Sequence, residues 1–213
     1  PQYVINTHWH QDHTGGNSYW AEEGATVIAH NNVRKRMQEG LDNKALGVVF
    51  PPSPPEALPV MTFSNQFSLY ANGEAIVVEH FSAGHTDGDS IVFFTNDNVV
   101  HMGDHFFNGR FPFIDIESGG SVQGYIANVE AILSRIDSAV QIVPGHGPLA
   151  SKADLEAYHA MLTLTVDAVS AQLAQGMTVA DIVDRGLGDE WQSWDGGFIS
   201  EAQWIRTIAA SVQ

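Results

Sequence analysis

The 213-residue sequence has no cysteine, and it has only 9 lysines and arginines against 25 aspartates and glutamates, a formal net charge of −16. Without cysteine, a disulfide scaffold, a cysteine-ligated metal site and a cysteine nucleophile are excluded. The acidic balance disfavours contact with phosphate backbones, so we expect no nucleic-acid partner. No apolar run approaches the roughly 20 residues that span a bilayer, so we expect no membrane insertion.

The sequence also lacks an initiator methionine, and no targeting peptide precedes its first predicted strand. The sequence therefore does not decide whether the protein lies in the cytoplasm, in the periplasm or outside the cell. Hydrophobic residues make up 44% of the chain, which is enough for a substantial core, and no linker separates two halves. We predict a single domain over residues 1–213.

Hydrophobic periodicity predicts a layered α/β fold with a mixed sheet. Strands are predicted at residues 3–7, 26–29, 66–70, 75–81, 90–95, 99–102 and 140–143. Helices are predicted at residues 17–23, 31–39, 121–135, 151–175 and 178–185, and from 200 to the C-terminus. Ser151 and Asp154 have the spacing of a capping box at the start of the longest helix. Residues 41–59 contain five prolines and are predicted to form a surface loop, a candidate lid.

Four potential metal ligands crowd into the segment THWHQDH directly after the first predicted strand. In an extended segment, residues two apart point the same way, so His8 and His10 can share one ion. Asp12 and His13 lie beyond the strand, where the chain turns, and can point at a second position nearby. This spacing indicates two adjacent metals rather than one.

Three further candidates repeat one context, a strand followed by glycine and then a ligand. They are His85 in AGHTDGD, Asp104 in MGDH and His146 in VPGHG. Glycine allows the close backbone approach that a loop under an ion needs. Imidazole and carboxylate donors without thiolate favour zinc, with iron or manganese as alternatives.

These motifs, THWHQDHTGGN, AGHTDGD, GDHFF and VPGHGP in this order, resemble the metallo-β-lactamase superfamily of binuclear metallohydrolases. The resemblance implies an αββα sandwich with two zinc ions at one edge. It implies that the first metal is held by His8, His10 and His85, and the second by Asp12, His13 and His146. Asp104 would bridge the two, as in the glyoxalase II and lactonase pattern.

Members of the superfamily usually carry additional strands ahead of the HxHxDH motif, which here begins at residue 8. The resemblance therefore implies an N-terminally truncated sandwich. If the chain stands alone, we expect the sheet that contains residues 3–7 to expose an edge that invites self-association.

The implied activity is zinc-dependent hydrolysis, in which a metal-bridging hydroxide attacks the carbonyl of an ester, thioester, lactone or β-lactam. Asp12 and Asp104 are the catalytic candidates, and the partner is a small-molecule substrate. One alternative is an iron-dependent oxygenase resembling the persulfide dioxygenases, with a single iron on two histidines and one aspartate. The other is a binding protein without catalysis on the same scaffold. Candidate substrate contacts are Trp9, Phe107, Arg110 and Phe111.

Overall fold

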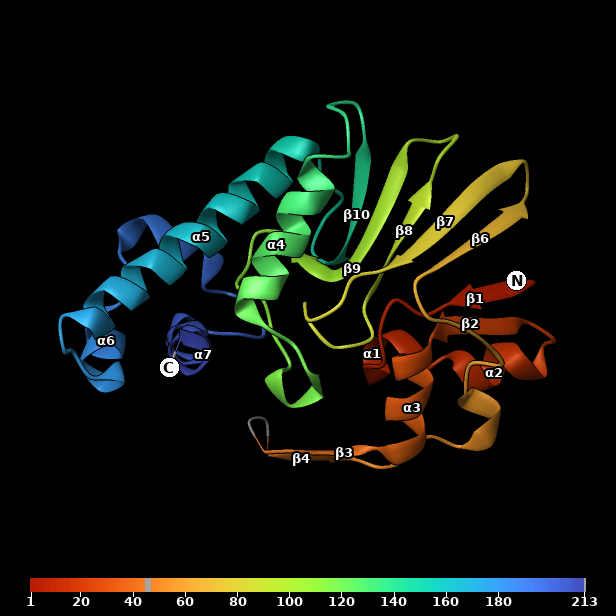
Figure 1. Ribbon diagram of the computed structural model, residues 1–213, viewed down its shortest axis with the longest axis horizontal. Helices are drawn as coiled ribbons and strands as arrows, with labels where there is room; N and C mark the ends of the chain where they lie inside the picture. The colour runs from red at the N-terminus through yellow and green to blue at the C-terminus, as the bar shows by residue number, and fades with distance from the viewer. Residues whose placement is uncertain (45–46, 213) are drawn as a thin grey trace.

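Two β-sheets lie between two layers of helices in the computed structural model, which describes residues 1–44 and 47–212 (Figure 1). The smaller sheet is parallel, in the order β1 (Tyr3–Ile5), β2 (Thr26–His30) and β5 (Met61–Phe63). The larger sheet has five strands in the order β10-β9-β8-β7-β6. The predicted αββα sandwich is confirmed.

Most of the larger sheet follows from successive hairpins. Strands β6 (Gln66–Ala71), β7 (Glu74–His80), β8 (Ser90–Phe94) and β9 (Val99–Phe107) are antiparallel neighbours, and β10 (Gln141–His146) joins β9 in parallel. Asn72 and Gly73 both have positive φ between β6 and β7, as a tight two-residue hairpin requires.

The C-terminal helices cover the outer face of the larger sheet (Figure 1). They are α4 (Val122–Leu133), α5 (Lys152–Ala174), α6 (Val179–Arg185) and α7 (Glu201–Val212). The main core lies between these helices and the sheet, where Met102, Phe106, Tyr125 and Tyr158 are fully buried. The predicted capping box of α5 is present, with both Ser151 and Asp154 bonded as expected.

The N-terminal helices α1 (Gln11–Thr14), α2 (Asn17–Glu22) and α3 (Asn31–Glu39) belong to the half of the molecule that holds the smaller sheet. Helices α2 and α3 lie on its outer side (Figure 1). Val33 and Met37 of α3 pack against Ala29 of β2 in a second, smaller core cluster. Short 3-10 helices lie at Pro55–Ala57, Ile116–Ser118 and Asp189–Trp194.

The structure corrects two predicted boundaries. Strand β9 continues through Phe107 because it pairs with β10 along its length, so Asp104 and His146 lie within strands rather than after them. The proline-rich segment is not a plain loop, since β3 (Leu41–Asn43) and β4 (Val48–Phe50) pair within it. Residues 45 and 46 of that segment lie outside the described residues.

Candidate metal centre

The seven predicted ligands converge at one edge of the sandwich, where both sheets contribute chain ends. His8 and His10 follow β1, and Asp12 and His13 lie in α1. The remaining three come from the larger sheet, with His85 between β7 and β8, Asp104 in β9 and His146 at the end of β10. The approach of the two sheets therefore assembles the cluster.

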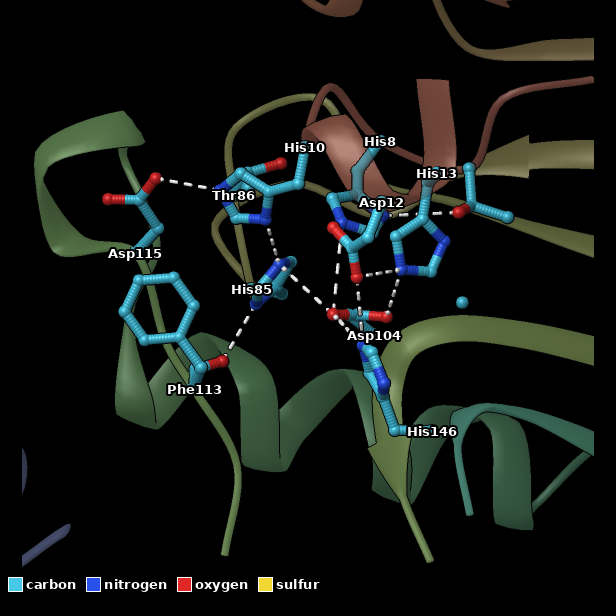
Figure 2. Close-up of polar contacts among 12 residues, drawn as sticks. His8, His10, Asp12, His13, His85, Thr86, Asp104, Phe113, Asp115 and His146 are labelled. Carbon is cyan, nitrogen blue, oxygen red and sulfur yellow. Dashed lines mark hydrogen bonds and ion pairs between the residues drawn. The ribbon is translucent and has the colours of Figure 1, made fainter. Parts of the chain in front are cut away.

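The donor atoms form two groups (Figure 2). In the first, the donor atoms of His8, His10, His85 and Asp104 lie within 4.8 Å of one another, and all four residues are buried. The second group has the same span and is more open to solvent; it consists of Asp12, His13 and His146. The structure thus brings His8, His10 and His85 together with Asp104, and places Asp12, His13 and His146 in a separate group beside them.

Asp104 contacts both groups. Its Oδ2 lies 3.5 Å from His85 Nε2 and 3.8 Å from His8 Nε2, in the first group. The same carboxylate lies 3.1 Å from His13 Nε2 through Oδ1 and 3.3 Å from His146 Nε2 through Oδ2. One carboxylate thus faces four imidazoles, which is the placement that the bridging role requires.

Hydrogen bonds fix the first group in the tautomers that metal binding needs. His10 Nε2 lies 3.0 Å from Asp115 Oδ2, and His85 Nδ1 lies 2.7 Å from the carbonyl of Phe113 (Figure 2). Because carboxylates and carbonyls only accept, each of these nitrogens carries the proton. The opposite nitrogens, His10 Nδ1 and His85 Nε2, then face each other as lone pairs only 2.8 Å apart.

Two facing lone pairs repel unless a cation lies beside them, so this pair fits a metal. His8 adds a third donor, because its Nδ1 lies 3.1 Å from Thr7 Oγ1 while its buried Nε2 has no hydrogen-bond partner among the described residues. Each of the three imidazoles is held through the nitrogen that is not offered to the centre, as in protein metal sites generally.

The pKa values agree with metal binding by the first group. Burial lowers the pKa of His8 well below its usual value and that of His85 to about 4, so both are neutral near pH 7. Burial opposes the charge on Asp104, yet His8 and His85 beside it hold the pKa of its carboxyl well below its usual range. Neutral imidazoles and an ionised carboxylate are the protonation states that bind metals.

The second group is charged when no metal is present. Burial disfavours a proton on His13, but the carboxylates of Asp104 and Asp12 outweigh it and raise its pKa to about 9. Asp104 and Asp12 likewise raise the pKa of His146 to about 10. Protons on these two histidines therefore occupy positions that a metal would take.

Glycine allows the strands beneath the site to come this close. A Cβ on Gly145 of β10 would overlap Asp104 Oδ1 and the backbone of Gly103. Gly103 itself has a positive φ of 50°, and a Cβ there would lie 2.8 Å from Thr7 Oγ1. Steric crowding therefore explains why glycine precedes Asp104 and His146 in the sequence.

A family model described as the metallo-β-lactamase superfamily matches residues 1–146, a stretch that contains every ligand candidate. The chain belongs to the metallo-β-lactamase superfamily. Members of this superfamily bind a metal centre, in agreement with the buried cluster of histidines and Asp104. The match ends at His146, and the helical layer of α5 to α7 follows it.

Solved structures show the same fold. A metallo-β-lactamase from Pontibacter korlensis matches with a TM-score of 0.61 and 18% identity, over 75% of this chain and 67% of its own. TTHA1623 in a di-iron-bound form matches with a TM-score of 0.59 and 26% identity, over 74% and 75%. A double mutant of the sec-alkyl sulfatase PisA1 matches with a TM-score of 0.68 and 12% identity, over 97% of this chain and 40% of its own.

Of the four predicted substrate contacts, two line a cavity at the candidate metal centre and two do not. Phe107 and Arg110 line a cavity beside the donor groups. Phe111 does not, because it is 1% exposed in the main core and stacks on Trp204. Trp9 is also wrong as a wall of that cavity; it is 5% exposed and packs against Phe50 in the second core cluster.

Sequence reasoning missed three residues that shape the site. Asp115 accepts hydrogen bonds from His10, Ser118 and Asn43. Phe50 and Phe198 line the cavity from segments far apart in sequence. The one available signal was for Asp115, an acid between two isoleucines directly after the apolar run 111–114.

No helix among residues 1–44 and 47–212 combines the length and apolar character that a bilayer crossing requires.

Proposed function

We propose that this chain is a zinc-dependent hydrolase with two ions per chain, acting on an ester, thioester, lactone or β-lactam carbonyl. The observation that carries the proposal is the contact of Asp104 with both donor groups. His8, His10 and His85 would hold the first ion, Asp12, His13 and His146 the second, and Asp104 both. When bound by these residues, two divalent ions would supply a water nucleophile at neutral pH and would polarise the carbonyl.

The chain's own residues position these parts. Asp115 and the Phe113 carbonyl hold His10 and His85 in the tautomers described above. The Asp12 side chain is 57% exposed and lines the cavity, so its carboxylate faces an incoming substrate. Its pKa is held far below the usual value by His13 and His146, so Asp12 is ionised at neutral pH and its Oδ2 holds these two imidazoles in place.

Metal analysis joined to a hydrolase panel tests the proposal. We expect close to two zinc ions per chain after loading, and hydrolysis of a chromogenic ester or cephalosporin that a chelator abolishes and zinc restores. A secondary alkyl sulfate belongs in the panel, because one structural relative is a sec-alkyl sulfatase. Metal-loaded protein that leaves every substrate intact would contradict the proposal.

Oxygen uptake separates the hydrolase from the oxygenase alternative. About one iron per chain with persulfide-dependent oxygen uptake would replace the present proposal. Two donor groups joined by one carboxylate favour a two-metal centre, and the di-iron form of TTHA1623 shows why iron must be assayed beside zinc. A chain that binds no metal would fit only a binding protein on this scaffold.

A further inference from the structure

The cavity beside the donor groups has two chemically different walls. Its volume is about 560 Å³, which is large enough for a small organic molecule. One wall carries the donor groups through His10, Asp12, Asp104 and His146. The other is aromatic, formed by Phe50, Phe107, Phe113 and Phe198. A substrate here would place its reacting bond at the first wall and an apolar body on the second.

One positively charged side chain lines the cavity together with the aromatic residues. Arg110 is the sole lysine or arginine among the described residues that line the cavity. Its stem lies against Gly197, where an added Cβ would come within 3.0 Å of Arg110 Cδ and 3.1 Å of its Cβ. The absence of a side chain at Gly197 therefore gives the arginine stem its position beside the cavity.

The Arg110 guanidinium has no carboxylate partner within the described chain, unlike two other arginines. Arg36 bonds both oxygens of Asp87, and Arg135 bonds both oxygens of Glu79. No ion pair or side-chain hydrogen bond joins Arg110 to any described residue, although the protein is strongly acidic. A guanidinium has five donors, and a half-buried one is stabilised when a ligand supplies the acceptors.

We propose that Arg110 selects substrates that carry a carboxylate at the end of an apolar body, so that the preferred substrate is an anionic, amphiphilic ester, thioester or lactone. This inference rests on the hydrolase function proposed above. A carboxylate matches the planar fork of arginine through two parallel hydrogen bonds. The phenyl rings hold the apolar part between Arg110 and the donor groups.

Two esters of equal length test the selection. 4-Nitrophenyl hydrogen suberate ends in a carboxylate, and 4-nitrophenyl octanoate ends in a methyl group. We expect the wild-type kcat/KM to favour the suberate. Arg110→Gln should lower kcat/KM for the suberate by about 10- to 100-fold, the range for hydrogen bonds to a charged group, and change the octanoate value less than about twofold. Arg110→Lys should keep part of the preference.

Arg206→Gln is the matched control, because Arg206 is exposed on α7 and does not line the cavity. It removes the same charge and should leave both esters unaffected. An equal loss on both esters in Arg110→Gln, or no preference in the wild type, would overturn the inference while leaving the hydrolase function intact.

Calorimetry keeps the inference testable if neither ester is cleaved, because it measures binding and does not depend on the hydrolase function. In the metal-free protein we expect 4-phenylbutyrate to bind more tightly than 4-phenylbutanol. Arg110→Gln should reduce that difference, although protonated His146 still lines the cavity, and Arg206→Gln should retain it in full. Equal binding of the acid and the alcohol to the wild type would contradict a role for Arg110 in recognising a carboxylate.

Discussion

The sharpest feature at the scale of single residues is the Asp104 carboxylate, which has four imidazoles around it. Asp104→Ala removes the donor shared by both groups, so we expect less than one metal ion per chain and loss of most activity. Elemental analysis after dialysis measures the first effect. His159→Gln on α5, outside both groups, should keep the wild-type metal content, and a full complement of metal in Asp104→Ala would contradict the two-group arrangement.

Asp115 offers a subtler test, because it acts through His10 rather than on a metal. Asp115→Asn keeps an oxygen that can accept from His10 Nε2 but removes its charge. Loss of such a partner typically weakens metal binding by about 10- to 100-fold, and Asp115→Ala should weaken it more than Asp115→Asn. Competition with a chromogenic chelator measures the change. Asp42→Asn, an exposed control on β3, should leave the affinity unaltered.

Among the elements, α5 depends on its first turn for its start. The Ser151 side chain accepts from the backbone of Asp154, and the Asp154 carboxylate accepts from the backbone of Ser151. Ser151→Ala removes one of these bonds and should lower the free energy of unfolding by about 1 kcal/mol. Urea denaturation checks this, with Ser138→Ala in an exposed turn as the control. Metal content should stay at the wild-type value, because α5 carries no donor.

The individual elements also show how much of the fold can be predicted from the sequence alone. Local signals suffice for α5, whose capping box and apolar periodicity lie in its own residues, and for the β6–β7 turn at Asn72 and Gly73. They fail where an element depends on a distant partner. Strand β9 extends through Phe107 only because β10 lies beside it, and nothing near Phe107 indicates β10.

The same distinction applies to the site. The candidate metal donors carry dense local motifs, so their proximity could be predicted from spacing and from the family resemblance. The aromatic wall could not, because Phe50 and Phe198 meet the cavity from segments almost 150 positions apart and no motif marks either one. Phe111 and Phe107 have the same side chain, lie four residues apart and both belong to the main core, yet tertiary packing places only Phe107 at the cavity as well.

On the scale of the whole molecule, stability without metal should depend on pH in both directions. Below the ordinary histidine pKa of 6.5, the unfolded chain binds a proton that folded His85, with a pKa of about 4, does not. Stability therefore falls as the pH drops from 6.5 towards 4. Above 6.5, folded His13 and His146 keep protons, up to pKa values of about 9 and 10, that the unfolded chain loses, so stability falls again.

Thermal melting of chelator-treated protein across this range should thus show a maximum near pH 6.5. The alkaline decline is moderated because His146 is partly exposed and its ion pairs are screened. If zinc binds as proposed, it would take the place of the protons on His13 and His146, so loaded protein should lose the alkaline decline. A decline of equal size with and without zinc would contradict the placement of these histidines at the metal centre.

The smaller sheet carries a second molecule-scale prediction. Strand β1 pairs with β2 alone among the described strands, and Tyr3 on it is 39% exposed. An unpaired edge invites pairing with another copy, so we expect concentration-dependent self-association. Sedimentation velocity over a range of concentrations measures it, and Tyr3→Lys should weaken it. A monomer at every concentration would refute the prediction.

The convergence of donors from both sheets has a consequence for how the chain holds together. His10 and His85 lie 75 positions apart in sequence, and they reach the cluster from different sheets. An ion held by both is a cross-link, and cross-links of long loops stabilise a fold by restricting the unfolded chain. The ion would then tether the smaller sheet to the larger one, so its removal would loosen the N-terminal half while the helical core around α4 and α5 stayed closed.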